Sequence, residues 1–565
     1  MERRTFLKIL SSAGIVSLVS PTFAMEVCKN KVSKSSSALL ESAFRNPPFS
    51  SGVYTWWHWM NGNITKDGIT RDLEAMKANG IAGYQLFEAG SGIPIGPVES
   101  LSDEWVDLIL HTLKESERLG LEFAMHNCPG WSSSGGPWIT PDKAMQIITW
   151  SETKITGGKQ VRIQLPTPKH MFDYYIDTYC LAIPANMKVI PRLSILELSN
   201  RLDKDGVLTW DVPTGEWLIM RFGQTAKDQK NKSAPSKSTG LDCDKFSTEA
   251  LDYHLNCMFK RLMPAMEKIA KHSKIGLLID SYETGDQDWT SDMPAYFEQS
   301  HGYELYPFLP VLANKIVESE ESTKRFLFDF RRVRADMFAE RYYGHFQKRC
   351  KEKGIITYTE PYGGNMMEEL QVAQQLDINM GEFWCGQTVL WANYKYNRTV
   401  KQVASIVHTL GGKVVGAEAF TSEPDADKWL QYPYALKSLG DYMFTRGLSR
   451  IYFHRFAHQP HPTAAPGMTM GAWGLHFDRT NTWWKPGKAW IEYLNRCQYI
   501  FQSSTFYGDI LYHNGDDSFG STIEPEQTLL APPEGYDYDM VNTEMLDKAH
   551  IKLSLIHISE PTRRS

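Results

Sequence analysis

Short apolar runs alternate with amphipathic segments along the chain from Gly52 onward. Runs this short and this rich in β-branched and aromatic residues predict buried strands, whereas apolar positions that recur every three or four residues predict the helices between them. Eight strands are predicted, at Val53–Trp59, Gly83–Phe87, Glu122–His126, Ile275–Ile279, Ile355–Thr359, Ile378–Met380, Lys413–Gly416 and Arg450–Phe453. This alternation predicts an α/β fold, a (β/α)8 barrel of the TIM type.

The segments between these runs have the ends expected of helices. Asp103–Leu119 carries acidic residues early and basic residues late, as the helix dipole favours, and Gly80 follows Ile69–Asn79 where a left-handed cap is needed. Further helices are predicted at Thr248–His272, Ser322–Lys353, Thr399–Leu410 and Trp429–Thr445.

The helix–strand rhythm stops between residues 145 and 233, where polar and apolar residues alternate with a period of two. This pattern predicts a small β-rich module inserted into a catalytic barrel that spans residues 46–500. Residues 501–552 are rich in Gly, Asp and Pro and are expected to begin a further β-rich domain that is incomplete in this chain.

The two ends of the chain lack the helix–strand pattern of the rest. Arg3-Arg4, an apolar stretch and Ala24 resemble a twin-arginine export signal over residues 1–24, followed by a linker over residues 25–45. We therefore expect an exported, periplasmic protein with no membrane span after cleavage, because the apolar stretch is too short to cross a bilayer. Residues 553–565 resemble a translated sequencing adapter and are expected to be a non-native tail.

Composition narrows the class of ligand. A net charge of −6 excludes a basic surface for nucleic acid, whereas the 12% aromatic content provides flat faces on which sugar rings can stack, although a large core also needs aromatic residues. The sequence has no C-x-x-C pair, G-x-S-x-G elbow, phosphate-binding G-x-x-x-x-G-K or H-E-x-x-H motif. Metal-ribbon, serine-hydrolase and nucleotide-binding chemistry are therefore unsupported.

Several of the predicted strands end in carboxylates. In an α/β barrel the active site is built from the carboxyl ends of the strands, so Glu283 after the fourth strand and Glu418 after the seventh are expected to face each other across the barrel mouth. Glycosidic bond cleavage needs two such groups, one to protonate the departing oxygen and one to act on the far side of the sugar. The alternative is that each acid caps a helix or pairs with an arginine.

Other residues are expected to complete this mouth. Glu88, Glu360 and Glu382 also follow strands, and so many carboxylates in one place need a cation or a shared proton. A site for a hard cation with oxygen ligands is therefore expected among these acids. Substrate binding is predicted for Asp280, Trp57, His58, His126, Asn127, Trp131, Glu360 and His454, although the loop after His126 also fits an Ω-loop packed by its own tryptophans.

Five longer segments carry a resemblance to a known family. Residues Trp56–Asp72, His126–Thr140, Asp280–Glu283, Thr359–Gly363 and Gly416–Phe420 resemble glycoside hydrolase family 106, the bacterial α-L-rhamnosidases, over about residues 45–552. The resemblance implies an inverting hydrolase that releases terminal L-rhamnose from plant or bacterial glycans such as pectin, with Glu283 and Glu418 as its acid and base. It also implies a Ca2+ ion near the sugar, with Asp280, Glu360 and Glu382 serving the substrate or the metal, and Glu382 and Glu360 as the expected Ca2+ ligands.

An inverting mechanism places the two catalytic carboxyl groups roughly 6.5–9.5 Å apart. The chain departs from the family in its length, because family members continue into further domains. Two alternatives remain at this point: a retaining, β-galactosidase-like barrel glycosidase, and a glycan-binding protein that does not hydrolyse its ligand.

Overall fold

The computed structural model describes residues 34–90, 92–132, 134–272, 274–385, 390–422, 428–471, 474–515 and 531–549. The predicted export signal and the predicted adapter-derived tail lie outside these residues. Within the described part of the chain, no helix is both long and apolar enough to cross a membrane. The seven cysteines in that part all carry free thiols.

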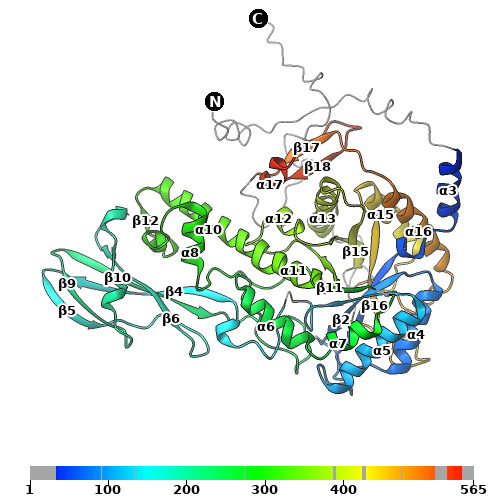
Figure 1. Cartoon of the computed structure of the whole chain (residues 1–565), viewed down its shortest axis with the longest axis horizontal. Coiled ribbons are helices and arrows are strands. Elements are labelled where there is room, and N and C mark those ends of the chain that lie inside the picture. The colour runs from blue at the N-terminus through cyan, green and yellow to red at the C-terminus, as the bar shows by residue number, and fades with distance from the viewer. Residues whose placement is uncertain are drawn as a thin grey trace, which may run out of the picture.

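Eight parallel strands close into a barrel, in the order β1-β16-β15-β14-β13-β11-β3-β2 (Figure 1). They are β1 (Tyr54–Met60), β2 (Gly83–Ala89), β3 (Glu122–His126), β11 (Ile275–Ile279), β13 (Ile356–Thr359), β14 (Ile378–Cys385), β15 (Val415–Ser422) and β16 (Arg450–Ala457). These are the eight strands that the sequence predicts, so the (β/α)8 fold is confirmed.

Three of the barrel strands are longer than predicted. β14, β15 and β16 continue for four to six residues past their predicted ends, because the residues that follow are still buried and pair with the neighbouring strand. Glu382 and Glu418 therefore lie inside β14 and β15 rather than after them, and they are direct partners in the register. Side chains at partnered positions of parallel strands point to the same side of the sheet.

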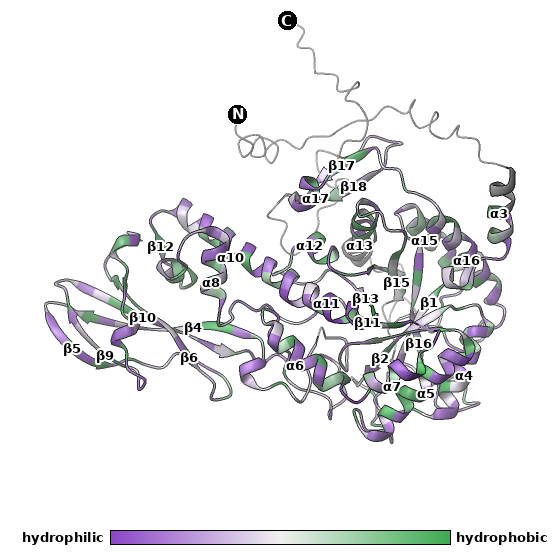
Figure 2. Cartoon of the chain, in the orientation of Figure 1, coloured by the Kyte–Doolittle hydropathy of each residue, from purple (hydrophilic) through white to green (hydrophobic). Residues whose placement is uncertain are grey.

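Helices surround the barrel (Figure 1). They include α4 (Lys66–Ala78), α5 (Asp103–Leu119), α6 (Thr248–Phe259), α7 (Met263–Ile269), α10 (Glu320–Met337), α11 (His345–Lys351), α12 (Glu369–Ala373), α13 (Leu390–Thr409), α15 (Pro433–Thr445) and α16 (Lys488–Ser503). Figure 2 shows hydrophilic and hydrophobic residues around single helices such as α4 and α5, as expected where one face covers the sheet.

Two long predicted helices are interrupted. The segment 248–272 forms α6 and α7, because Pro264 stands in the first turn of α7 and begins a new helix. The segment 322–353 forms α10 and α11, joined by a π-helical stretch at Phe338–Gly344. The α5 prediction is correct at both ends, where the Ser102 side chain accepts a hydrogen bond from the Trp105 N–H and Gly120 adopts a left-handed conformation.

A β module projects from one side of the barrel (Figure 1). Its antiparallel sheet has the order β4-β10-β6-β8, and β5 pairs with β9. The strands are β4 (Gln146–Thr156), β5 (Lys159–Gln164), β6 (Ile176–Pro184), β8 (Leu196–Glu197), β9 (Val207–Val212) and β10 (Glu216–Ala226). The module is inserted between β3 and β11, which are neighbours in the barrel. Some of its buried residues form a hydrophobic cluster of their own around Trp210 and Ile219, whereas others, such as Met220 and Phe222, belong to the main core.

Two further small elements pack beside these units. β7 (Val189–Ile190) of the module pairs with β12 (Ile316–Val317), which follows α8 (Met293–His301) and α9 (Leu309–Leu312). Near the end of the chain, β17 (Ile510–His513) and β18 (Tyr538–Val541) form a parallel pair followed by α17 (Thr543–Asp547). This pair shares a hydrophobic cluster with α12 and α13. α3 (Lys34–Arg45) precedes the barrel.

Candidate active site

A cavity of about 360 Å³ opens where the barrel strands end. β1, β2, β14, β15 and β16 contribute to it, together with the loops that follow β3 and β11, so it lies at the face of the barrel where active sites form. It is lined by Trp56, His58, Phe87, Trp131, Lys232, Asp280, Ser281, Glu283, Glu382, Trp384, Glu418, Thr421, His454 and Met470.

The predicted pair of acids, Glu283 and Glu418, lines this one cavity from opposite sides of the barrel. Glu283 lies at the rim with its side chain 42% exposed, and its carboxylate accepts hydrogen bonds from Lys232 Nζ at 2.8 Å and Trp131 Nε1 at 3.1 Å. Glu418 is only 6% exposed. Its carboxyl group accepts a hydrogen bond from the Thr421 hydroxyl, and His454 Nδ1 lies 3.8 Å away.

Burial and mutual repulsion raise the pKa of three carboxyl groups in the floor of the cavity. The pKa of Glu418 is raised well above its ordinary value, first by burial and then by the neighbouring Glu382 carboxylate. Burial and the nearby Glu418 raise the pKa of Glu360, and burial and Glu283 raise that of Asp280. Four acids in this space cannot all be ionised without compensation by protons or by a cation.

The donors around this floor suit a hard cation in their chemistry. Carboxylate oxygens are the ligands that Ca2+ prefers, and Glu360 and Glu382 are both buried here. Each already accepts a hydrogen bond, Glu360 from the Tyr362 hydroxyl at 2.6 Å and Glu382 from Trp384 Nε1. Among the described residues no three His, Cys, Asp or Glu side chains are arranged as a metal site. Water or substrate oxygens would have to complete the coordination.

Four of the predicted substrate-binding residues line the cavity: His58, Trp131, Asp280 and His454. Burial lowers the pKa of His454 to about 3, and burial and His454 lower that of His58. Both imidazoles are therefore neutral near pH 7, so each presents one donor and one acceptor nitrogen. Neutral groups of this kind suit the hydroxyl groups of an uncharged ligand.

The remaining predicted substrate-binding residues do not line the cavity. Trp57 points to the opposite side of β1, because neighbouring side chains in a strand alternate, and its Nε1 donates to Asp72 at 3.2 Å beneath the helices. Trp56 and His58 face the cavity in its place. Glu360 is buried and does not line the cavity, and Glu418 and Asp280 lie near enough to raise its pKa.

His126 and Asn127 support the loop after β3 from below. His126 Nδ1 lies 2.8 Å from the Cys128 carbonyl oxygen, and its ring stacks on Phe87 with centroids 5.0 Å apart. Asn127 Nδ2 donates to the Leu278 carbonyl at 2.9 Å. Both side chains are fully buried, so they fix the loop that carries Trp131 rather than face the cavity.

Lys232 is the functional candidate that sequence reasoning missed. It lies in the segment that leads from the β module back to the barrel, and its backbone carbonyl accepts a hydrogen bond from the Trp131 N–H at 3.1 Å. Gly130 permits this contact, because a Cβ at that position would lie 2.1 Å from the Lys232 carbonyl oxygen. The inserted module thus delivers a cation to Glu283, although no local motif marks Lys232.

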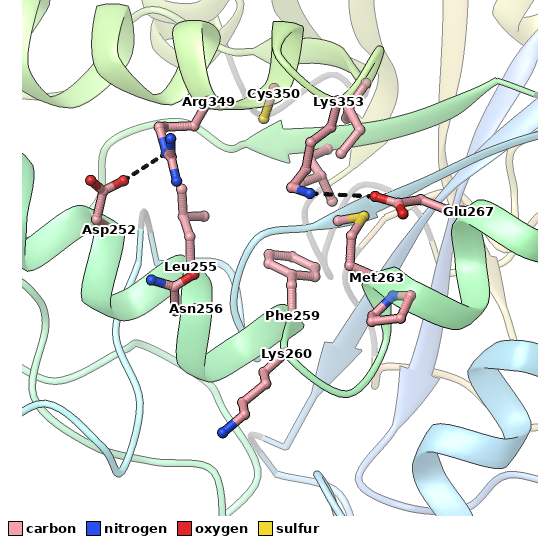
Figure 3. A pocket seen from close by; sticks show the side chains of 13 residues that line it. Asp252, Leu255, Asn256, Phe259, Lys260, Met263, Glu267, Arg349, Cys350 and Lys353 are labelled. Atoms are coloured by element: carbon pink, nitrogen blue, oxygen red, sulfur yellow. Dashed lines mark hydrogen bonds and ion pairs between the residues drawn. The ribbon is translucent and has the colours of Figure 1, made fainter.

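A second cavity, of about 250 Å³, lies on the outside of the barrel between α6, α7 and α11 (Figure 3). Its walls are the apolar side chains Leu255, Phe259 and Met263, and ion pairs flank it. Arg349 pairs with Asp252 at 2.9 Å and Lys353 with Glu267 at 3.4 Å. Because its acids are each neutralised by a cation, this groove lacks the opposed carboxyl groups of the barrel mouth.

Glu88, the remaining acid at a predicted strand end, is buried at the end of β2 outside the main cavity. It accepts a hydrogen bond from Ser100 Oγ at 2.6 Å, and burial raises its pKa to about 7. This makes Glu88 a structural carboxyl group whose protonation affects folding.

Replacing Glu88 with Gln is expected to flatten the dependence of stability on pH. Because the folded pKa is raised from 4.5 to about 7, stability from this group is complete below about pH 4.5 and is lost as the pH rises through about 7. Over that window the wild type should lose on the order of 3 kcal/mol in unfolding free energy that E88Q retains. Chemical denaturation at pH 5 and pH 8 measures this, and equal losses in both proteins would contradict it.

A (β/α)8 barrel with opposed acids in its mouth is an arrangement that glycoside hydrolases use. The family model described as alpha-L-rhamnosidase, glycoside hydrolase family 106, matches residues 45–178 and 169–558. The chain therefore belongs to glycoside hydrolase family 106, as the resemblance of its motifs indicates.

Two known proteins resemble the chain over most of its length. A rhamnosidase structure from Novosphingobium sp. PP1Y superposes with a TM-score of 0.80 at 23% identity, covering 90% of this chain and 64% of the other, which supports the fold. A Formosa agariphila protein provisionally named a beta-glucuronidase is 39% identical over 547 residues. That match covers 91% of this chain but 46% of the Formosa protein, so the chain spans less than half of this curated relative.

Proposed function

We propose that this chain is the barrel region of an enzyme that releases terminal α-L-rhamnose from plant or bacterial glycans, such as pectin, with inversion. The observation that supports it best is that Glu283 and Glu418 line one cavity in a chain that belongs to a family described as alpha-L-rhamnosidase. Hydrolysis requires one protonated and one ionised carboxyl group on opposite sides of the sugar.

The surroundings of the two acids differ. Burial raises the pKa of Glu418 and so favours its protonated form, whereas Glu283 forms an ion pair with Lys232 at the rim. The division of roles is tested with substrates of different leaving groups. The variant that lacks the general acid should regain activity on aryl glycosides with good leaving groups, whereas the variant that lacks the base should not.

The rest of the cavity suits a deoxy sugar. The aromatic rings of Trp56, Phe87 and Trp131 provide apolar surface for the C6 methyl group of rhamnose, and Trp56 stacks on Phe87 with centroids 4.3 Å apart. The neutral His58 and His454 can donate to and accept from the ring hydroxyls. Rhamnose carries no charged substituent, so it needs no charged binding partner in the cavity.

We also propose that Ca2+ binds beside the sugar through Glu360 and Glu382, where it would neutralise the crowded acids and hold a vicinal diol. Removal of metal with EDTA is expected to lower kcat/KM at least about tenfold, with recovery on adding Ca2+. Ca2+ at 100 times its Kd should raise the unfolding free energy by about 2.7 kcal/mol. Equal thermal midpoints with EDTA and with Ca2+ would contradict the proposal.

The name of the Formosa protein makes β-glucuronide hydrolysis the second candidate. Assays of aryl α-L-rhamnoside, aryl β-D-glucuronide and aryl β-D-galactoside side by side, with the full-length enzyme, distinguish the candidates. We expect rhamnose release alone, detected as the initial β anomer by NMR if the reaction inverts. Release of glucuronic acid or galactose would replace this proposal, and binding without turnover would indicate a glycan-binding protein.

We further propose export to the periplasm through the twin-arginine pathway, from the Arg3-Arg4 segment. Replacing both arginines with lysine should retain the protein in the cytoplasm of a Gram-negative host, as measured by cell fractionation. Unchanged export of this variant would contradict the proposal.

A further inference from the structure

A third cavity, of about 400 Å³, adjoins the candidate catalytic pocket. Thr469 lines this third cavity, and the next residue, Met470, lines the catalytic pocket, so a single stretch of chain forms the wall between them. Arg455 of β16 braces that wall, since its Nη2 donates to Thr469 Oγ1 at 3.3 Å. A volume of this size is in the usual range for small-ligand sites.

An aromatic platform forms one side of this cavity. The Trp429 indole stacks in parallel on the His476 imidazole, with centroids 3.8 Å apart and an angle of 6° between the planes. Trp429 is nevertheless 57% exposed, so His476 covers one face of the indole while much of the ring is open to solvent. A large aromatic ring held flat at the surface is a suitable surface for the apolar face of a sugar.

Contacts of His476 and of the segment after Trp429 hold the Trp429 indole in place. Burial and Arg455 lower the pKa of His476 to about 4, so a neutral ring supports the indole. His476 Nδ1 lies 3.2 Å from Thr469 Oγ1 in the shared wall. The segment after Trp429 is held by Trp483, whose Nε1 donates to the Gln431 carbonyl oxygen at 3.1 Å. A platform with so little freedom loses little entropy when a ligand binds.

Polar groups and further aromatic rings extend the cavity. Asp478, Thr480 and Asn481 also line it and carry carboxyl, hydroxyl and amide groups, which are the usual partners of sugar hydroxyls. Tyr432 and Tyr434 are exposed just beyond Trp429, and their rings stack with centroids 6.5 Å apart. The aromatic surface therefore continues outward from the cavity along the start of α15.

From these contacts we propose that the Trp429 cavity is a second sugar-binding subsite, which receives a neighbouring residue of an oligosaccharide whose terminal sugar occupies the catalytic pocket. This rests on the proposed function, since it takes the pocket with Glu283 and Glu418 as the place of cleavage. The ligand class is an uncharged or weakly charged oligosaccharide of at least two residues, with one ring stacked on Trp429.

The test compares a short and a long substrate with the full-length enzyme. For W429A, we expect kcat/KM on an uncharged, rhamnose-terminated oligosaccharide, relative to that on an aryl α-L-rhamnoside, to fall about tenfold through a rise in KM. W429F keeps a flat ring and should lose less. The control is Y442A, which removes an exposed aromatic ring from α15 away from the cavity and should match the wild type on both substrates.

Failure of the subsite and failure of the proposed function give different results. If W429A loses the same factor on both substrates, or nothing on either, the subsite proposal is wrong while rhamnosidase activity stands. If the wild type cleaves no rhamnoside, the proposed function is wrong, and calorimetric titration of the same oligosaccharide into wild type and W429A decides the subsite. Tighter binding by the wild type would support it, and equal or absent binding would overturn it.

Discussion

Replacing Glu418 with Gln is expected to lower kcat/KM for a rhamnose-terminated oligosaccharide by about 10³-fold, because the departing sugar is a poor leaving group and proton transfer by a positioned carboxyl group contributes 10²–10⁴ to the rate. Gln keeps the shape of the side chain and its contact with Thr421, so the loss belongs to chemistry and not to packing. The effect should appear in kcat, since the interaction matters most in the transition state.

Stability measurements separate this loss from misfolding. Burial disfavours the charged form of Glu418, so E418Q should unfold at the same or a higher temperature than the wild type. E352Q is the matched control, because Glu352 follows α11 on the outside of the barrel and pairs with Arg349. An E418Q protein that keeps more than about a tenth of the activity on that oligosaccharide would exclude Glu418 from the catalytic pair.

The barrel could be predicted because each of its strands is recognisable from its own short stretch of sequence. A strand buried on both faces needs an unbroken apolar run, and the alternation of such runs with amphipathic helices leaves few other folds. Strand ends were harder to predict. Gly416 and Glu418 look like a turn, yet β15 continues to Ser422 because Phe420 and Thr421 are buried against the neighbouring strands. A polar side chain pointing into the barrel mouth does not end a strand.

The site could be predicted only in part, for a related reason. Acids near the carboxyl ends of strands are brought together by the barrel itself, which is how Glu283 and Glu418 come to line one cavity. Whether Trp56 or Trp57 faces the cavity depends on which face of β1 points inward. Side chains alternate between the two faces of a strand, but four consecutive aromatic residues, 56–59, leave no polar–apolar pattern that would show which face is which. Lys232 arrives from the inserted module, so its contact with Glu283 depends on tertiary structure alone.

A buried ion pair between Asp242 and Lys245 holds a loop of the candidate active site in place. Asp242 and Lys245 are both inaccessible to solvent, and the Asp242 carboxylate also accepts hydrogen bonds from Ser132 and Ser134. These serines belong to the loop that carries Trp131, whose indole in turn donates to Glu283. The pair therefore holds the loop against the segment that follows the β module.

Replacing Asp242 with Ala is expected to lower the free energy of unfolding by about 3–5 kcal/mol, because the Lys245 ammonium group would remain buried without its partner. The double variant D242N/K245M removes both charges and should recover most of that loss. E321A is the control. Glu321 and Arg325 form an ion pair with side chains 73% and 76% exposed, so loss of this pair should lower the free energy of unfolding by less than about 1 kcal/mol. Urea denaturation measures all three, and a D242A loss no larger than that of E321A would show that the buried pair does not stabilise the fold.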